Sequence, residues 1–483
     1  MIILGTNSIK DTGYNVANSV RLNDGSSDGF SLSGQNGNRK TFTFSCWVKR
    51  GVFGENFLFN SRIDASNHFL TRFTGGHQLE LLNRTSASNN FILTTNRLFR
   101  DVSAWYHIVV AVDTTQSTAN DRVKFYVNGV QETSFATQTM GSQNADLSLN
   151  ISTATHYIGQ EYTSGYNFFD GYMAETILID GSQLAPDQFG EFDEDSGIWK
   201  PIDVSGLTFG TNGFYLDFED SAALGDDVSG NTNNFTVNNL TAIDQTTDTC
   251  TNNFMTLNPL ITFTSVTDNQ VYSEGNTIVI PNSTDNYGTA FGTFGATRGK
   301  WYWEAQIIWN GTSNNANFPK QIGFMREDYA FNKSYLGQDD DQTWGVGFAD
   351  LDTDGWGLDH NGSFGAISGA TTLADDKMVM FALDLDNGKF YMGYDGTFFT
   401  SGDPTSGATG TGAIATLDAT DLSFTIIPAL TNATNTTYYK MNFGNPAYAI
   451  ASSNADGNGF GNFEFAVPSG YFSWCTKNLS EYG

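Results

Sequence analysis

The residues best suited to binding a metal ion lie in the run Asp350-Leu351-Asp352-Thr353-Asp354-Gly355. Its three carboxylates at alternating positions match the start of an oxygen-ligand loop, and calcium prefers such clustered oxygen ligands. However, Asn361 stands where an EF-hand carries its bidentate glutamate, and no helical pattern flanks the run. Two interpretations therefore stay open: a solvated acidic turn, or a calcium site whose ligands would be Asp350, Asp352, Asp354 and Asp359.

A catalytic constellation is harder to find. Glycosidases need two carboxylates on either side of the scissile bond. The nearest acidic run, Glu191–Asp195, ends before Ser196, which stands where a Glu-x-Asp-x-x-Glu pattern needs its last acid. The five histidines are scattered and suggest no triad with a serine or cysteine; they are His68, His77, His107, His156 and His360. The sequence thus predicts a protein that is not an enzyme, with Glu191–Asp195 as an exposed acidic loop.

Composition excludes several classes of partner. The chain has 52 acidic and 23 basic residues, a net charge of −29, so it repels nucleic acid and anionic membranes. No segment approaches the ~20 apolar residues of a membrane-spanning helix. The N-terminus lacks the basic and apolar regions of a signal peptide, which predicts a protein made in a cytoplasm and not exported through the usual secretory channel. Cys46, Cys250 and Cys475 are far apart in sequence and are expected to be buried free thiols.

The elements that must position any site are strands. Short runs rich in Phe, Tyr, Val, Ile and Thr alternate with Gly, Asn, Asp and Ser, which is typical of sandwiches and barrels. The clearest predicted strands are residues 41–49, 106–113, 122–127, 301–308 and 379–384. Tight type I′ hairpins are expected at Asn128-Gly129, Asn387-Gly388 and Asp395-Gly396, because these residues tolerate positive φ angles.

Three segments follow from this pattern. We predict a first β-sandwich over residues 1–200, a connector over 201–253, and a second β-sandwich over 254–483. The segment Gly213–Phe218 looks like a strand that could complete the first sandwich or pack between the two. The predicted fold class is therefore all-β, with two antiparallel jelly-roll-type sandwiches in tandem.

The first segment resembles the laminin G-like, concanavalin A-like family. The resemblance covers nearly the whole domain and rests on six stretches, which are Ser19–Phe30, Thr43–Lys49, Trp105–Val110, Lys124–Gly129, Tyr157–Gly159 and Phe169–Glu175. The last segment resembles SPRY domains, in the order Gly299–Glu304, Gln321–Phe324, Trp344–Val346, Asp384–Tyr391, Asn442–Gly444 and Pro468–Tyr471.

The SPRY resemblance implies a ligand site, because SPRY domains bind partners through loops at one end of the sandwich. Aromatic rings in such loops stack well on sugar rings and on partner side chains. Among the candidates, Trp356 looks most loop-like, since it directly follows Asp354-Gly355. The candidate ligand-binding residues are Trp344, Trp356, Tyr394 and Phe398, against the alternative that most of them belong to the core.

The combination of the two domains resembles virion proteins of tailed bacteriophages. It implies a virion surface protein made in the host cytoplasm, with other virion proteins as partners. The leading hypothesis is a tail-fibre or adhesion component that binds a host surface glycan or protein. The alternatives are a structural decoration or connecting protein of capsid or tail, and an endoglycanase. An oligomer is expected, a trimer among the options, although no residue pattern specifies three-fold packing.

Overall fold

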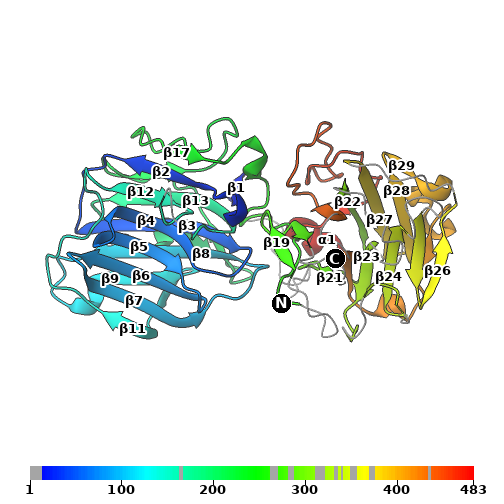
Figure 1. Cartoon of the computed structure of the whole chain (residues 1–483), viewed down its shortest axis with the longest axis horizontal. Coiled ribbons are helices and arrows are strands. Elements are labelled where there is room, and N and C mark those ends of the chain that lie inside the picture. The colour runs from blue at the N-terminus through cyan, green and yellow to red at the C-terminus, as the bar shows by residue number, and fades with distance from the viewer. Residues whose placement is uncertain are drawn as a thin grey trace. The chain divides into compact units, whose positions relative to one another are not determined.

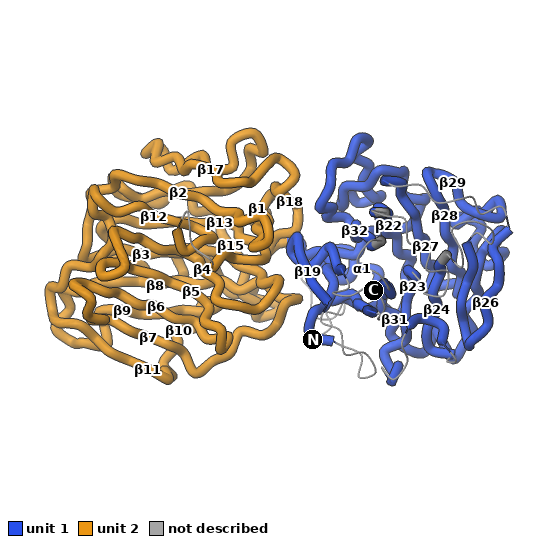
Figure 2. The backbone as a smooth tube through the Cα atoms, in the orientation of Figure 1, with its two compact units in different colours: residues 1–10, 252–483 blue, residues 11–251 orange. Residues whose placement is uncertain are grey.

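A computed structural model describes residues 13–162, 167–261, 270–280, 288–309, 321–330, 335–338, 341–348, 356–368, 376–432 and 437–483. The chain divides into two compact units, Asp11–Thr251 and Asn252–Gly483, which are described separately (Figure 2). Both consist of antiparallel sheets (Figure 1), so the predicted all-β class is confirmed. Among the described residues, no helix has the length and apolar character needed to cross a membrane.

The first unit contains two eight-stranded sheets. One has the order β10-β9-β8-β3-β13-β1-β18, with β16 also paired to β13. Its strands are β1 Ser19–Leu22, β3 Thr41–Arg50, β8 Trp105–Asp113, β9 Val123–Val127, β10 Val130–Glu132, β13 Gly171–Asp180, β16 Phe214–Leu216 and β18 Gln245–Thr246. The other has the order β11-β7-β6-β5-β4-β12-β2-β17. Its strands are β2 Gly29–Ser33, β4 Asn56–Asp64, β5 Asn67–Phe73, β6 Gln78–Thr85, β7 Ser88–Leu98, β11 Phe135–Thr139, β12 Thr155–Ile158 and β17 Thr236–Asn238.

The core between these sheets is formed by every second side chain of each strand, as β6 illustrates. In β6, Leu79 and Leu81 are fully buried in the core, while Glu80 and Leu82 on the other face are partly exposed. This two-residue period is the signature of a sheet with one buried face. A separate hairpin of β14 Gly190–Phe192 and β15 Trp199–Pro201 completes the strands of the unit. Single 3₁₀ turns lie at Asp24–Ser26, Ala119–Asp121, Pro186–Gln188 and Ala242–Asp244.

The predicted connector is wrong for most of its length. Residues 201–251 belong to the first unit, in which β16 pairs with β13, β17 with β2 and β18 with β1. The strand expected within Gly213–Phe218 is present and completes this sandwich, with Phe214 and Leu216 fully buried. The strands of this segment are only two or three residues long, and turns rich in Asn, Thr and Asp connect them. The segment therefore resembles a linker in its sequence.

A buried ion pair fastens the end of this segment to the sheet. The Lys49 Nζ lies 2.8 Å from Asp248 Oδ2, and both side chains are at most 1 % exposed. Trp105 Nε1 donates to the other carboxylate oxygen at 3.1 Å, and Ser19 Oγ donates to the Asp248 carbonyl at 2.6 Å. Burial lowers the pKa of Lys49 below its usual value, and Asp248 opposes that shift. Asp248, near the end of the first unit, is thereby linked to Ser19 in β1, Lys49 in β3 and Trp105 in β8.

The second unit also has two sheets. The larger has the order β19-β20-β32-β22-β27-β28-β29, with β30 beside β28 and β33 parallel to β22. Its strands are β19 Val271–Ser273, β20 Ile278–Ile280, β22 Lys300–Trp309, β27 Met378–Asp384, β28 Lys389–Tyr394, β29 Thr397–Phe398, β30 Ala415–Thr416, β32 Thr437–Asn442 and β33 Phe472–Ser473. The smaller has the order β21-β31-β23-β24-β25-β26. Its strands are β21 Gly288–Phe291, β23 Gln321–Arg326, β24 Thr343–Phe348, β25 Trp356–His360, β26 Ser363–Ala366 and β31 Ile426–Asn432.

Short helices and turns complete the second unit. Helix α1 covers Thr476–Tyr482, and 3₁₀ turns lie at Phe399–Ser401, Pro404–Thr409 and Asp421–Ser423. Two of the expected hairpins have positive φ at both turn residues: Asn128-Gly129 (48° and 77°) and Asp395-Gly396 (48° and 87°). The third prediction needs correction, because β27 and β28 are joined by four residues and only Gly388 has a positive φ.

Candidate functional site

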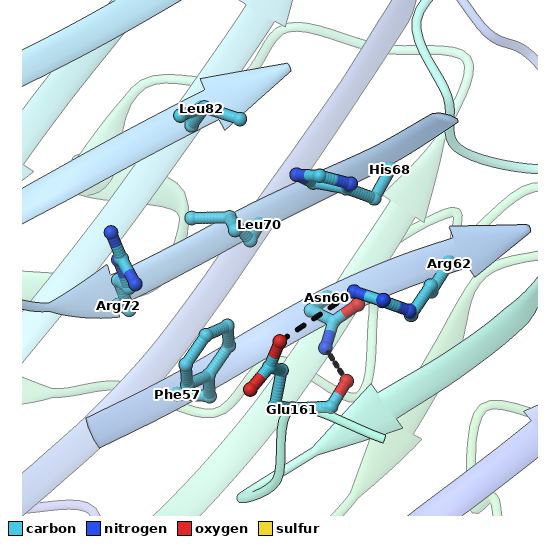
Figure 3. A pocket seen from close by; sticks show the side chains of 8 residues that line it. All are labelled: Phe57, Asn60, Arg62, His68, Leu70, Arg72, Leu82 and Glu161. Atoms are coloured by element: carbon cyan, nitrogen blue, oxygen red, sulfur yellow. Dashed lines mark hydrogen bonds and ion pairs between the residues drawn. The ribbon is translucent and has the colours of Figure 1, made fainter. Parts of the chain in front are cut away.

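A groove of about 150 Å³ lies on the outer face of β4, β5 and β6 in the first unit (Figure 3). Its walls combine apolar, basic, acidic and amide side chains, listed as Phe57, Asn60, Arg62, His68, Leu70, Arg72, Leu82 and Glu161. Since pockets for drug-sized ligands measure ~300–1,000 Å³, this one has room for a single small polar group or one unit of a longer ligand.

Strand alternation brings these side chains to one face. His68, Leu70 and Arg72 are every second residue of β5, and their neighbours Phe69 and Phe73 point into the core. In β4 the pattern is shifted by a bulge between Phe57 and Phe59. The bulge puts Phe57 opposite Arg72, on the same face as the groove, as bulges often do when they redirect a side chain.

The two arginines of the groove are engaged to different degrees. Arg72 donates from Nε and one terminal nitrogen to Glu80 at 3.0 and 2.9 Å, and from the other to Glu55 at 2.9 Å. Arg62 lies 3.5 Å from Glu161 and stacks 4.4 Å from the Tyr162 ring centroid. Within the described part of the chain, the Arg62 side chain makes no hydrogen bond of normal length, so its donors are available to a ligand.

Glu161 is held in place by its neighbours. Asn167 Nδ2 donates to its Oε2 at 2.8 Å, and Asn60 Nδ2 donates to its backbone carbonyl (Figure 3). Asn60 is only 2 % exposed and also donates to the Gln160 carbonyl at 3.3 Å. The carboxylate therefore stands at the groove wall as a fixed acceptor next to the Arg62 donors.

His68 adds a neutral ring to the same wall. Burial, together with the charges of Arg62 and Arg84, lowers the pKa of His68 below its usual 6.5, against an opposing hydrogen bond to the Asp64 backbone. The imidazole is therefore uncharged at neutral pH. Arg62 stands opposite Glu161, and Arg72 is bound to Glu80 and Glu55, so each guanidinium of the groove has a carboxylate partner. The arrangement suits a neutral ligand that both donates and accepts hydrogen bonds.

The predicted calcium ligands are only partly described. Asp350, Asp352 and Asp354 lie outside the described residues. Asp359 lies in β25, is 9 % exposed and accepts a hydrogen bond from Gln321 Nε2 at 3.1 Å. Among the described residues, no group of three or more His, Cys, Asp or Glu could hold a metal ion. The calcium site remains a prediction.

The predicted aromatic ligand site needs correction. Trp344 and Trp356 lie within β24 and β25, 2 % and 1 % exposed, so their faces cannot stack on a ligand. Trp344 is packed between Phe324 and His360, with ring centroids 4.9 and 4.5 Å away. Tyr394 and Phe398 are half-buried in the β28–β29 hairpin. The four residues therefore do not form one exposed aromatic surface. Both tryptophans point inward because they occupy the core-facing positions of their strands.

The acidic run Glu191–Asp195, expected as an exposed loop, covers the last two residues of β14 and the start of the turn that follows. Asp193 accepts hydrogen bonds from the Ser196 amide and hydroxyl at 2.9 and 2.7 Å, and Lys200 Nζ lies 3.2 Å away. Glu191, with its side chain 59 % exposed, also pairs with Lys200 at 3.4 Å. These contacts hold the β14–β15 turn in shape.

Two buried carboxyl groups escaped the sequence analysis. Burial raises the pKa of Glu175 to about 8, and it raises the pKa of Glu304 to about 7. Glu175 accepts from the Tyr215 hydroxyl at 2.8 Å, and Glu304 accepts from Tyr302 at 2.8 Å and from two backbone amides at 2.9 Å. Neither lines the groove. The sequence pattern that could have indicated them is a single acidic residue within an otherwise apolar strand, as in Ala174-Glu175-Thr176.

Comparison with known proteins finds a family match within the first unit. Residues 24–183 match the family model of the concanavalin A-like lectin/glucanases superfamily. This stretch of the chain is therefore similar to a concanavalin A-like domain. This confirms the laminin G-like resemblance for that part of the chain. No curated protein matches the chain at a significant level.

Several solved structures match the chain at low identity and with low TM-scores. The SPRY domain of human HERC1 is 15 % identical (TM-score 0.24), over 34 % of this chain and 86 % of that one. Domains LG4-5 of the mouse laminin alpha1 chain are 10 % identical (TM-score 0.28), over 87 % and 83 %. A putative carbohydrate-binding protein from Bacteroides ovatus is 16 % identical (TM-score 0.34), over 47 % and 59 %. Such matches carry no information about ligands.

Proposed function

We propose that the protein acts by binding and that the groove on β4–β6 receives a neutral saccharide. The observation that carries this proposal is the groove itself, where the Arg62 donors stand beside the fixed Glu161 acceptor over an apolar floor. A sugar hydroxyl both donates and accepts, and the carbon faces of a sugar ring are apolar. Leu70 and Leu82 would contact such a face, while Arg62, Glu161 and His68 would bond its hydroxyls.

The positions of the carboxyl groups favour binding over hydrolysis of a saccharide. A glycosidase needs two carboxyls flanking one bond, one of them kept protonated as the acid. Among the residues that line the groove, Glu161 is the only carboxylate. Glu175 and Glu304, the carboxyls whose pKa is raised most among the described residues, are 5 % and 0 % exposed and accept internal hydrogen bonds. An endoglycanase would require a second acid at the groove.

We further propose that the saccharide belongs to a bacterial surface and that the protein is an adhesion component of a tailed-phage particle. Support for this setting is the order of a lectin-like and a SPRY-like domain in one acidic chain. Cryo-electron microscopy of intact virions tests it. A protein located at the distal end of the tail, with its groove exposed to solvent, would support the adhesion role. A groove covered by neighbouring virion proteins would favour the structural alternative, a decoration or connecting protein.

The Arg62→Ala substitution tests the groove directly. We expect it to weaken saccharide binding at least tenfold, because it removes the available guanidinium and leaves Glu161 without its ion pair. Affinity electrophoresis of the full chain measures this, in gels that contain dextran, levan, or a neutral capsular or O-antigen polysaccharide purified from bacteria, with and without calcium. Leu98→Ala, an exposed aliphatic residue on β7, is the matched control and should migrate as the parent protein does. If none of these polysaccharides retards the parent protein, the proposed saccharide binding is wrong.

A further inference from the structure

Lys49 lies in the sheet of the first unit that does not hold the groove, in the middle of its strand order. Strand β3 is paired on both sides, which places Trp105 of β8 and Tyr172 of β13 directly opposite Lys49. The preceding residue, Val48, belongs to the core between the two sheets, so Lys49 points away from that core. Its ammonium lies 5.3 Å from the centre of the Tyr172 ring. Two paired neighbours thus fix the backbone from which this amine extends.

Asp248 is held beside this amine by hydrogen bonds of its own backbone. Its carbonyl accepts from Ser19 Oγ at 2.6 Å, and its amide donates to Thr246 Oγ1 at 3.1 Å. Its Oδ2 lies 2.8 Å from Lys49 Nζ, and its Oδ1 accepts from Trp105 Nε1 at 3.1 Å. Both side chains are at most 1 % exposed. An amine and a carboxyl group are therefore held in contact at a site that bulk water does not reach.

Burial works against the charges of this pair. Desolvation disfavours charged groups, and it is the main cause that lowers the pKa of Lys49, while Asp248 and Asp101 oppose the shift. Transfer of one proton from Nζ to Oδ2 gives a neutral amine and a carboxylic acid, which are the two forms that can condense. Trp105 Nε1 donates to Oδ1, the oxygen that gains negative charge when a nitrogen attacks the carboxyl carbon.

From this geometry we infer that Lys49 and Asp248 condense to an intramolecular amide bond, a covalent modification of the chain. The Nζ–Cγ bond forms and the Cγ–Oδ2 bond breaks. Oδ2 leaves as water with two hydrogens of the original ammonium, and the third stays on the amide nitrogen, so the reaction consumes no oxidant or other reactant. Fixing the two groups in contact removes the entropic part of the barrier. The amide carries no charge, so its formation also ends the cost of burying two charges.

The bond would join β3 to the segment that follows β18, close to the end of the first unit at Thr251. It would close a long loop of chain between Lys49 and Asp248, and a closed loop stabilises a fold because it restricts the unfolded chain. The groove belongs to the other sheet, so the inference goes beyond saccharide binding and does not depend on it.

Mass spectrometry of the full chain tests this. We expect an intact mass lower than that of the sequence by one water molecule and, after peptic digestion, a linked pair of peptides that contain Lys49 and Asp248. Lys49→Arg and Asp248→Ala should each have the full mass of their sequences. The pair Lys377–Asp395 is the matched control, because its Nζ lies 2.6 Å from Oδ2 while both side chains are at least 44 % exposed. Water stabilises both of its charges, so it should yield no linked peptides.

Three results would overturn the bond. The first is a parent protein with the full mass of its sequence and no linked peptides, which would leave Lys49 and Asp248 as an ion pair. The second is a loss of water that persists in Lys49→Arg, since cyclisation at an Asp-Gly step such as Asp395-Gly396 changes the mass equally. The third is a linked product at Lys377–Asp395 as well, which would attribute the reaction to sample treatment rather than to burial. None of these results would bear on saccharide binding.

Discussion

Replacing Asp248 by alanine is expected to lower the free energy of unfolding of the first unit by about 3–5 kcal/mol. The substitution leaves the Lys49 ammonium buried, at most 1 % exposed, without the carboxylate 2.8 Å away. Breaking a buried pair from one side costs this much because the remaining charge is uncompensated. It also removes the acceptor of Trp105 Nε1. For a unit of this size, the loss corresponds to a midpoint lower by roughly 10 °C.

Urea denaturation of the full chain measures this loss, and hydrogen exchange of β3 peptides assigns the transition to the first unit. Asp146→Ala is the matched control. Its carboxylate is 52 % exposed and lies 3.8 Å from Lys40, so its removal should cost less than ~1 kcal/mol. A double change, Lys49→Met with Asp248→Leu, removes both charges and should recover part of the loss. Equal stability of the Asp248→Ala and Asp146→Ala proteins would show that the buried pair contributes nothing.

The second large effect concerns pH and Glu175. This residue lies in a bulge of β13 with a φ of +48° and is 5 % exposed. Burial is the main cause that raises its pKa to about 8, opposed by the Tyr215 hydrogen bond and reinforced by Asp217, Glu219 and Asp203. The folded unit therefore keeps the proton between pH 4.5 and about 8, where the unfolded chain releases it. Across this window stability falls as pH rises, by up to ~1.4 kcal/mol per pH unit.

Glu175→Gln should abolish this part of the pH dependence. The amide has nearly the same shape, can still accept from Tyr215 and cannot ionise. We expect equal stability of the two proteins at pH 5 and an advantage of a few kcal/mol for the variant at pH 9, measured by urea denaturation. Glu194→Gln, an exposed acid of the same unit, serves as the control and should follow the parent protein. Parallel pH profiles for parent and Glu175→Gln would contradict a protonated Glu175.

Local sequence patterns predicted the strands well because alternation acts over neighbouring residues. The predicted strand at residues 41–49 is β3, Thr41–Arg50, and the one at 379–384 is β27, Met378–Asp384. Sequence patterns did not predict strands whose formation depends on tertiary contacts. The short β16, β17 and β18 are stabilised by long strands of the sandwich rather than by their own sequence, so they resembled a connector.

The site was missed for a related reason. His68 and Arg72 alternate along one strand and mark an outward polar face, which the sequence does contain. Glu161, however, reaches Arg62 from about 100 residues away, and Phe57 faces the groove only because of a bulge. By contrast, Trp356 looked loop-like because it follows an acidic, glycine-containing run, yet its strand position buries it. Surface aromatics and core aromatics differ in their surroundings more than in their sequence.

The pairing of β1 with β18 determines how the first unit would carry mechanical load. Ser19 lies opposite Thr246, so the first and last strands of the first unit are neighbours in one sheet. Tension applied through the two ends would act first on this edge, on the Ser19–Asp248 hydrogen bond and on the ion pair behind it. The groove belongs to the other sheet, between β4 and β6. Tension on this unit would therefore separate the β1–β18 edge before it deformed the groove.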